Sequence, residues 1–254
     1  PVDSCIHRLD PRTKLFGTFV FLVSLFVTSS VPGYLLASLA LICCIRLSRV
    51  PISFMTRGLK AVFVLLLISV SFNMFFTGET VIFRLGFLRI TKEGLKLAGF
   101  MALRLVYLVI GSSVMTLTTT PTQLTDGLEK SLGFLNRFKV PVHDIAMMMS
   151  IALRFIPILT DETDKIIRAQ KARGADFESG NLIRRAKAMV PILVPLFIAA
   201  FRRASDLALA MEARCYHGGA GRTKMKPLKY ARRDRIAYVI MTVYFILMFA
   251  TRFI

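Results

Sequence analysis

Long apolar stretches, separated by basic connectors, dominate this chain. A helix that crosses a bilayer needs about 20 mostly apolar residues. Five stretches approach or reach that length: Leu15–Val31, Tyr34–Leu47, Leu59–Phe76, Leu97–Leu117 and Ile236–Ile254. The pattern therefore predicts an all-α membrane protein with about five transmembrane helices, which crosses the cell membrane several times.

Two connections between these stretches have turn signals. Pro32-Gly33 separates the first stretch from the second and predicts a turn there. Between the third and fourth stretches, β-branched and aromatic residues flank Gly86, which favours a hairpin over Val81–Thr91. We expect a small external β-hairpin near residues 80–91.

Lysine and arginine accumulate on the cytoplasmic side of membrane helices, and their distribution predicts the orientation of the chain. The turn Ser29–Gly33 carries no charge, whereas basic residues lie on both outer flanks of the first two stretches: Arg8, Arg12, Lys14, Arg46, Arg49, Arg57 and Lys60. This places the N-terminus in the cytoplasm and, with five spans, the C-terminus outside. The hairpin region opposes the rule with four basic residues, Arg84, Arg89, Lys92 and Lys96. We accept it as an exception.

The segment Thr119–Arg235 differs from the rest because it holds more than half of the net charge of +19. Its two apolar runs, Ile145–Ile158 and Ala188–Phe201, are shorter than a span and are flanked by charged residues. They predict long, partly amphipathic helices at the cytoplasmic face of the membrane, the second kinked at Pro191 and Pro195. The alternative is two further short spans, which would make a seven-span permease.

These features divide the chain into three parts. Residues 1–118 form a transmembrane bundle with the hairpin, residues 119–235 form the cytoplasmic helical region, and residues 236–254 form the last transmembrane helix. The chain has 254 residues, of which 55% are hydrophobic. A basic protein of this size also raises the possibility of nucleic-acid binding. Charged residues are sparse in the apolar runs and no nucleic-acid-binding motif occurs, so the expected partner is membrane lipid and not nucleic acid.

Residues suited to catalysis are scarce. The three histidines are far apart, and the cysteines have no metal-binding spacing: His7, His143, His217, Cys5, Cys43, Cys44 and Cys215. No glycine-rich phosphate loop occurs. We predict no catalytic residue, no metal and no cofactor in this chain. A self-contained permease or intramembrane enzyme remains the alternative, and it would need polar residues within the spans. Arg104 is either such a functional residue or a structural arginine that pairs with a neighbouring helix.

Two helix-patterned stretches in the basic region end on the same dipeptide. One closes on Ala172-Arg173-Gly174 and the other on Ala213-Arg214-Cys215. An arginine keeps its charge and offers a planar fork to a carboxylate, and the small alanine leaves room for a partner. Glycine at position 174 lets the backbone turn after the helix. Each arginine is therefore either a docking point or an ordinary basic residue that interacts with the helix dipole.

Several segments together resemble the transmembrane (T) component of energy-coupling factor transporters, and the resemblance extends over nearly the whole chain. They are His7–Leu15, Ile90–Leu95, Thr118–Pro121, Leu124–Leu128, Ala169–Ala175 and Met211–Tyr216, of which the last two are the most specific. Phe177–Leu196 and Gly218–Lys224 are more similar to the group whose module serves several vitamin-binding subunits.

The resemblance implies a role in ATP-driven import. In that family the two helix ends insert into grooves on two cytoplasmic ABC-type ATPase subunits, which bind the ATP. Residues 172–174 and 213–215 would then be the ATPase-docking sites, on long coupling helices. Movement would pass to one small substrate-binding (S) membrane subunit. Cys215 departs from the family pattern, which has glycine there, and a positive backbone φ at this position would be less comfortable.

Overall fold

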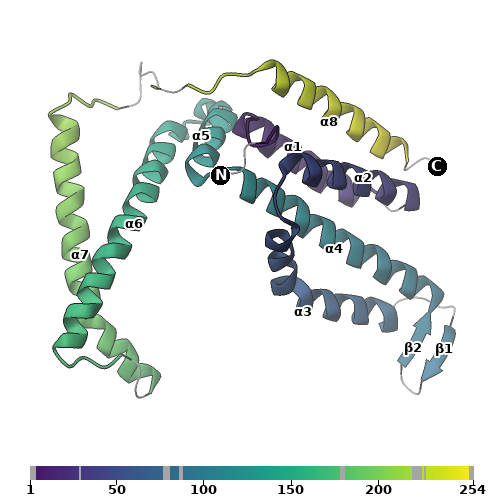
Figure 1. Cartoon of the computed structure of the whole chain (residues 1–254), viewed down its shortest axis with the longest axis horizontal. Helices are drawn as coiled ribbons and strands as arrows, with labels where there is room; N and C mark the ends of the chain where they lie inside the picture. Colours follow the sequence, from purple (N-terminus) through teal and green to yellow (C-terminus); the bar gives the residue numbers. More distant parts are fainter. Residues whose placement is uncertain are drawn as a thin grey trace. The chain divides into compact units, whose positions relative to one another are not determined.

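A computed structural model describes residues 4–28, 30–76, 81–85, 88–177, 181–218, 225 and 227–251. The expected hairpin turn at Gly86, the segment Gly219–Lys224 and the end of the last predicted span lie outside the described residues. The fold class is confirmed, because the protein is almost entirely helical (Figure 1). It forms two compact units, one of residues 1–127 and 228–254 and one of residues 128–227.

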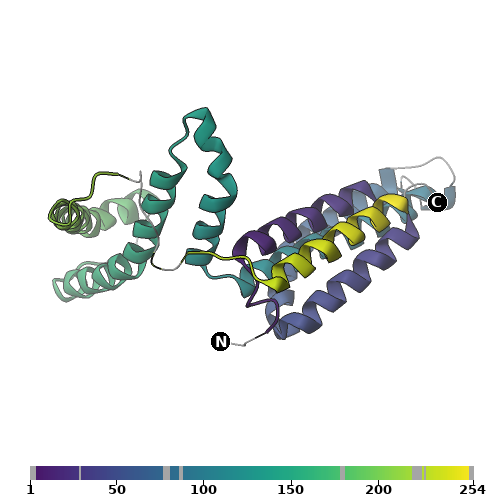
Figure 2. The same cartoon turned by 90° about the horizontal axis from the view of Figure 1, so that it is seen from above.

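The first unit is a bundle that joins the two ends of the chain. It contains α1 (Pro11–Val27), α2 (Val31–Ser48), α3 (Ile52–Phe76), α4 (Lys92–Thr118) and α8 (Arg232–Ala250). Helix α8 runs beside α1, and α4 contacts α1, α2 and α3 (Figure 2). Leu25, Ala37 and Met248 meet in the centre. Hydrogen bonds between helices add to this packing, such as the one of 2.9 Å between the hydroxyls of Ser24 and Tyr244.

The connection between α1 and α2 corrects the expected turn at Pro32-Gly33. Both residues lie in the first turn of α2, which begins at Val31. Proline is well tolerated there, because the first amides of a helix have no acceptor within it. The chain instead turns just after α1. Gly33 packs against Thr28, and a Cβ at this glycine would collide with the threonine methyl group.

The contacts of Arg104 favour the structural interpretation of this residue. Its Nε donates a hydrogen bond to the Tyr34 hydroxyl, and its Nη2 donates to the Thr28 carbonyl, both at 3.3 Å. Thr28 caps the C-terminus of α1, where a cation complements the helix dipole. Arg104 of α4 thus joins the α1 end to α2.

A short antiparallel pair, β1 (Val81–Leu85) and β2 (Leu88–Thr91), lies between α3 and α4. Leu85 is opposite Leu88, and Val81 is opposite Thr91. Strand β2 leads directly into α4. The Thr91 hydroxyl accepts a hydrogen bond of 3.1 Å from the Gly94 amide, so Thr91 caps the start of the helix. The external location of the strand pair stays a prediction.

In length and composition, four helices of the described chain can cross a membrane. They are Val31–Ser48, Glu93–Thr118, Val142–Ala172 and Arg185–Glu212, with a fifth if the bent halves of α3 count as one span. This set differs from the expected five. Helix α1 has only 17 residues, and α8 starts on a charged turn, so its apolar part is short. The assignment of α1 and α8 as spans stays a prediction.

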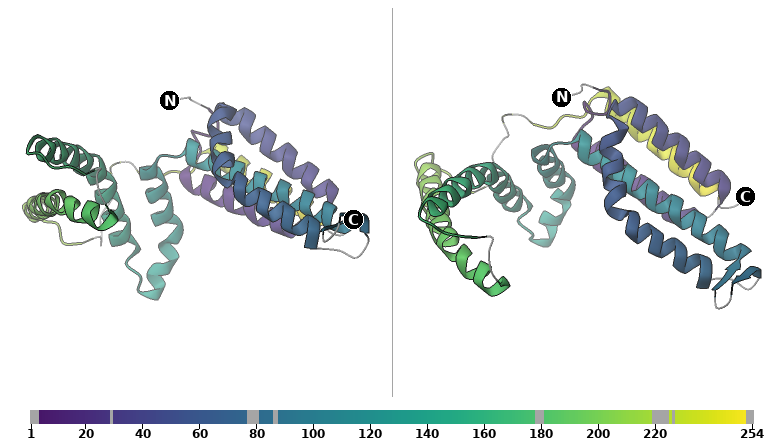
Figure 3. Two further views of the ribbon diagram at one scale, coloured as in Figure 1. Left: turned by 90° about the horizontal axis from the view of Figure 1, so that it is seen from below. Right: turned by 60° about the horizontal axis from the view of Figure 1, so that its bottom comes forward.

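The second unit contains the end of α5 (Pro121–Ser131), the 3₁₀ helix η1 (Leu132–Phe138), α6 (Val142–Ala172) and α7 (Leu182–Glu212). Helices α6 and α7 pack against each other (Figure 3). Each has 31 residues, and although the apolar runs within them are short, both helices are long and apolar enough to cross a membrane. The charged residues that flank each run are good helix formers and extend the helix. The location of both helices at the cytoplasmic face remains a prediction.

Candidate docking turns at the ends of α6 and α7

Helix α6 ends in a tight turn built around Arg173. The Gly174 amide donates to the Lys171 carbonyl and the Ala175 amide to the Gln170 carbonyl, both at 3.0 Å. Gly174 has a φ of +86°. This pair of bonds with a left-handed residue is the Schellman motif, which satisfies carbonyls at a helix end. Arg173 is the C-cap of the helix, so the motif fixes where its side chain leaves the backbone.

Helix α7 ends in the same motif. The Cys215 amide donates to the Glu212 carbonyl over 2.8 Å, and the Tyr216 amide donates to the Met211 carbonyl over 3.0 Å. Cys215 takes the place of Gly174 and has a φ of +55°. The ring Nδ1 of His217 lies 2.9 Å from the Cys215 carbonyl oxygen and adds a contact to the turn. Cys215 therefore adopts the positive φ that we expected to be unfavourable for a residue other than glycine.

Both arginines are exposed, as are the residues on either side of them in the two triplets. Neither guanidinium has a hydrogen bond or an ion pair with another described residue. An arginine side chain carries its positive charge throughout the physiological pH range. Each turn therefore presents an exposed cation to a partner from a hydrogen-bonded backbone.

The packing of α6 on α7 places the two turns far apart. The Glu162 carboxylate is 3.8 Å from the Arg203 guanidinium, and the side-chain amide nitrogen of Gln170 is 3.5 Å from the Pro191 carbonyl oxygen. Residue numbers rise along one helix as they fall along the other, so the helices are antiparallel. Arg173 is then level with the region near residue 190. At 1.5 Å per residue, Arg214 lies roughly 35 Å further along the pair. A single small groove on one partner domain would therefore not hold both turns.

The turns differ in how easily their backbone adopts the left-handed conformation, which leads to a prediction. Gly174→Ala should destabilise its turn by about 1 kcal/mol, because a Cβ disfavours positive φ. Cys215→Gly should stabilise the second turn by a similar amount and leave docking intact. Chemical denaturation in detergent micelles, followed by circular dichroism, measures both. An equal loss of stability in the two variants would contradict the assignment of matching motifs.

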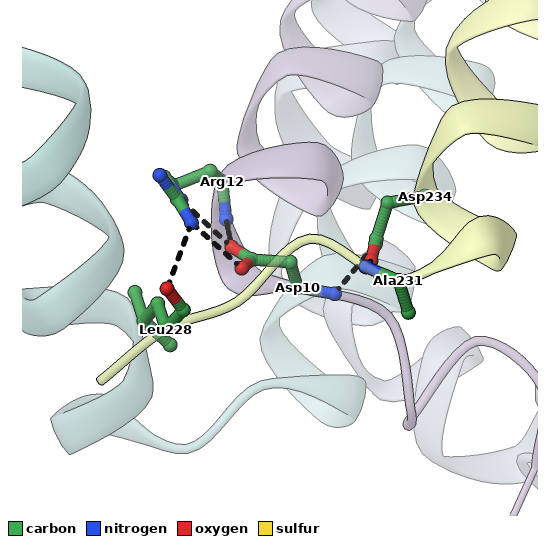
Figure 4. A network of polar contacts seen from close by, with 5 residues as sticks. All are labelled: Asp10, Arg12, Leu228, Ala231 and Asp234. Atoms are coloured by element: carbon green, nitrogen blue, oxygen red, sulfur yellow. Dashed lines mark hydrogen bonds and ion pairs between the residues drawn. The ribbon is translucent and has the colours of Figure 1, made fainter. Parts of the chain in front are cut away.

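A polar network that the sequence analysis did not identify lies where α1 and α8 begin (Figure 4). The Asp234 carboxylate accepts from the Asp10 amide over 2.9 Å and from the Ala231 amide over 2.8 Å. Arg12 forms a bidentate pair with the Asp10 carboxylate, with its Nε and Nη2 at 3.1 and 3.0 Å. Asp10 and Asp234 are buried, with exposed fractions of 7% and 2%. The network is therefore a desolvated contact between the two ends of the chain.

The Asp10 carboxylate is also the N-cap of α1, since it accepts from the Arg12 amide. Burial raises the pKa of this carboxyl, but the hydrogen bonds and the charge of Arg12 lower it more, so that the net pKa lies below its usual value. A lowered pKa means that the pair stabilises the fold at neutral pH. That contribution is lost only as the pH falls below about 4.

The histidines have local structural partners. His143 Nδ1 lies 2.9 Å from Glu129 Oε1 and links α5 to α6, whereas His7 Nδ1 lies 2.7 Å from the Ser4 hydroxyl. Among the described residues, no group of three or more His, Cys, Asp or Glu side chains is placed to hold a metal ion.

Comparison with known proteins agrees with this architecture. Residues 3–225 match the family described as cobalt transport protein (CbiQ). A relative from Clostridium kluyveri, named energy-coupling factor transporter transmembrane protein EcfT, is 55% identical over 239 residues, which cover 93% of this chain and 88% of the relative. Proteins of the same name from Ruminiclostridium cellulolyticum and Bacillus subtilis are 51% identical over 244 residues and 47% identical over 253 residues. These alignments cover 96% and 99% of this chain, and 91% and 96% of the relatives.

The fold and these relatives define a multi-pass membrane subunit of a transporter, which is not itself an enzyme. The chain belongs to the family of transmembrane (T) components of energy-coupling factor transporters.

Proposed function

We propose that this chain couples two cytoplasmic ABC-type ATPase subunits to one small substrate-binding membrane subunit, with Arg173 and Arg214 as the two docking points. The observation that carries the proposal is the repetition of one hydrogen-bonded turn at the ends of α6 and α7, each with an exposed arginine directly before the residue with positive φ. Two equal attachment points suit two equivalent or closely related partners.

The electrostatics support contacts with carboxylates. Each guanidinium can form two parallel hydrogen bonds to one carboxylate, which fixes orientation as well as adding affinity. The small side chains of Ala172 and Ala213 allow a groove wall to approach the turn. Motion of an ATPase groove would then move a long helix rather than a flexible loop. The ATP belongs to the partner subunits, and the chain needs no cofactor of its own.

The cargo and the topology complete the proposal. The resemblance to the group with a shared module favours vitamins as the transported compounds, captured by the S subunit. The N-terminus and the α6–α7 pair face the cytoplasm, where the ATPases are. The contacts of Arg104 with Tyr34 and Thr28 link helices and favour a structural role for this residue over a place in a self-contained permease.

The composition of the purified complex tests the proposal. We expect an affinity-tagged chain, extracted in a mild detergent from its native membrane, to carry two ATPase subunits and one small membrane subunit. Native mass spectrometry gives the stoichiometry, and the ATPases should be identified by their nucleotide-binding sequences. A tagged chain that transports alone, without ATPases, would contradict the proposal.

A further inference from the structure

The segment Asp10–Lys14, which gave part of the family resemblance, has no part in the docking turns. It nevertheless contacts both stretches of chain that connect the bundle to the α6–α7 region. The outgoing connection leaves α4 at Thr118 and follows α5, and the first unit ends at Gly127. The returning connection enters the first unit at Leu228 and begins α8 at Arg232. All the contacts described next lie within the first unit.

On the outgoing side, Lys14 and Pro11 hold the chain. The Lys14 ammonium donates to the carbonyl of Thr118, the last residue of α4, over 2.7 Å, and to the His7 carbonyl over 3.1 Å. Lys14 is only 6% exposed, so this is a cation buried against a helix C-terminus, a favourable arrangement. Gly127 packs so closely on Pro11 that a Cβ there would lie 2.9 Å from the proline Cβ. The outgoing chain is thus fixed at two points.

On the returning side, Arg12 holds the chain. Its Nη2 is 3.4 Å from the Leu228 carbonyl, and its Cζ lies 3.9 Å from the centre of the Tyr230 ring. Asp234 then joins the amides of Ala231 and Asp10. The two acids, Asp10 and Asp234, balance the two bases, Arg12 and Lys14. A buried and balanced network of this kind is rigid, because each broken contact leaves an unpaired polar group.

We propose that Asp10, Pro11, Arg12 and Lys14 form a junction clamp that transmits movement of the docking region into α1, α4 and α8. The inference rests on the proposed function and adds how the movement reaches the membrane bundle. Slack connections would absorb a displacement of the docking turns. Because both the outgoing and the returning connection are held against α1, a displacement instead passes to the packed bundle. The bundle then responds as a whole. These residues are positioning residues and touch neither ATP nor substrate.

Amide hydrogen exchange on the complex purified with its partners tests the clamp. The probe is a non-hydrolysable ATP analogue with Mg²⁺, and the readout is the change in exchange that it causes at the docking turns and at the start of α8. Arg12→Gln removes the guanidinium, and Arg12→Lys keeps the charge but loses the fork and the planar contact with Tyr230. Arg233→Gln is the control, because Arg233 is exposed at the same helix start and has no hydrogen bond or ion pair with other described residues.

In the wild type and the Arg233→Gln complex, we expect the analogue to change exchange at both places. In the Arg12 variants the response at the docking turns should persist, while the response at the start of α8 should fall at least fivefold. A wild-type response in α8 of both Arg12 variants would overturn the clamp. Loss of ATPase assembly in both would overturn it as well, since the segment would then serve folding alone. Failure of the wild-type chain to bind ATPases would instead contradict the proposed function.

Discussion

Replacing Arg173 and Arg214 together with alanine should remove the ATPase subunits from the purified complex. Loss of one partner from a buried, hydrogen-bonded ion pair costs about 2–5 kcal/mol, so each substitution alone should weaken attachment by roughly 30-fold or more. The double variant loses both attachment points and with them the gain from bivalent binding. ATPase subunits retained per chain, measured by quantitative mass spectrometry after affinity purification, give the result.

Matched controls separate docking from a general loss of positive charge. Arg168 in α6 and Arg202 in α7 are exposed and have no hydrogen bond or ion pair with other described residues. The double variant Arg168→Ala with Arg202→Ala removes the same charge from the same two helices and should retain the ATPases. Equal losses in the two double variants would mean that the complex depends on net charge, and the docking turns would lose their special role.

Asp234→Ala should be the most destabilising single substitution outside the docking turns. The carboxylate accepts from two amides at 2.9 and 2.8 Å in a buried position, and each buried donor without an acceptor costs about 1–3 kcal/mol. We expect the free energy of unfolding to fall by about 2–5 kcal/mol. Asp234→Asn keeps one acceptor oxygen and should lose less. Denaturant titration in detergent micelles, followed by circular dichroism, measures the change.

Asp206 provides the control for that experiment. It is an exposed acid in α7 and has no hydrogen bond or ion pair with other described residues. Asp206→Ala should change the free energy of unfolding by no more than about 0.5 kcal/mol. If Asp234→Ala proved as mild, the network between the two ends of the chain would contribute little to the fold.

The helical class and the positions of the helices follow from local sequence signals. Each apolar run is a signal by itself, so the first four predicted spans fall largely within α1 to α4. Their starts were less predictable. Helix α1 begins at Pro11 rather than Leu15, because Asp10 caps it and proline suits the first helical position. That signal was present in Asp10-Pro11 and indicates the true start of the helix.

Long helices over α6 and α7 were predicted, but their apolar runs alone did not show how far each helix extends. Charged residues interrupt the apolar pattern without interrupting the helix, as Arg202 and Arg203 do within α7. The two turns were predictable as candidates, because two helix-patterned stretches close on an Ala-Arg pair followed by a small residue. That Cys215 adopts a positive φ was not predictable from the residue alone, and only the glycine of the family pattern raised the question.

The polar network at the start of α1 and α8 could not be predicted from the sequence, because its residues are far apart in the chain. Asp10 and Asp234 are separated by 224 positions, and no periodic pattern connects residues so far apart. A pair of this kind becomes visible only when the fold brings α8 beside α1. A single sequence holds no covariation between positions, so it does not reveal this contact.

Site-specific photo-crosslinking is the most direct test of docking at both helix ends. Cys215 already lies in the second turn and is exposed. In one variant the other three cysteines are replaced by alanine, and a benzophenone is attached to Cys215. In a second variant all four cysteines are replaced by alanine, and Ala172→Cys carries the benzophenone. Both variants are labelled in the assembled complex. We predict that each position crosslinks to an ATPase subunit, and that the two positions together label two ATPase copies. Crosslinks only to lipid, or to neither ATPase, from a complex that hydrolyses ATP and transports would contradict the account.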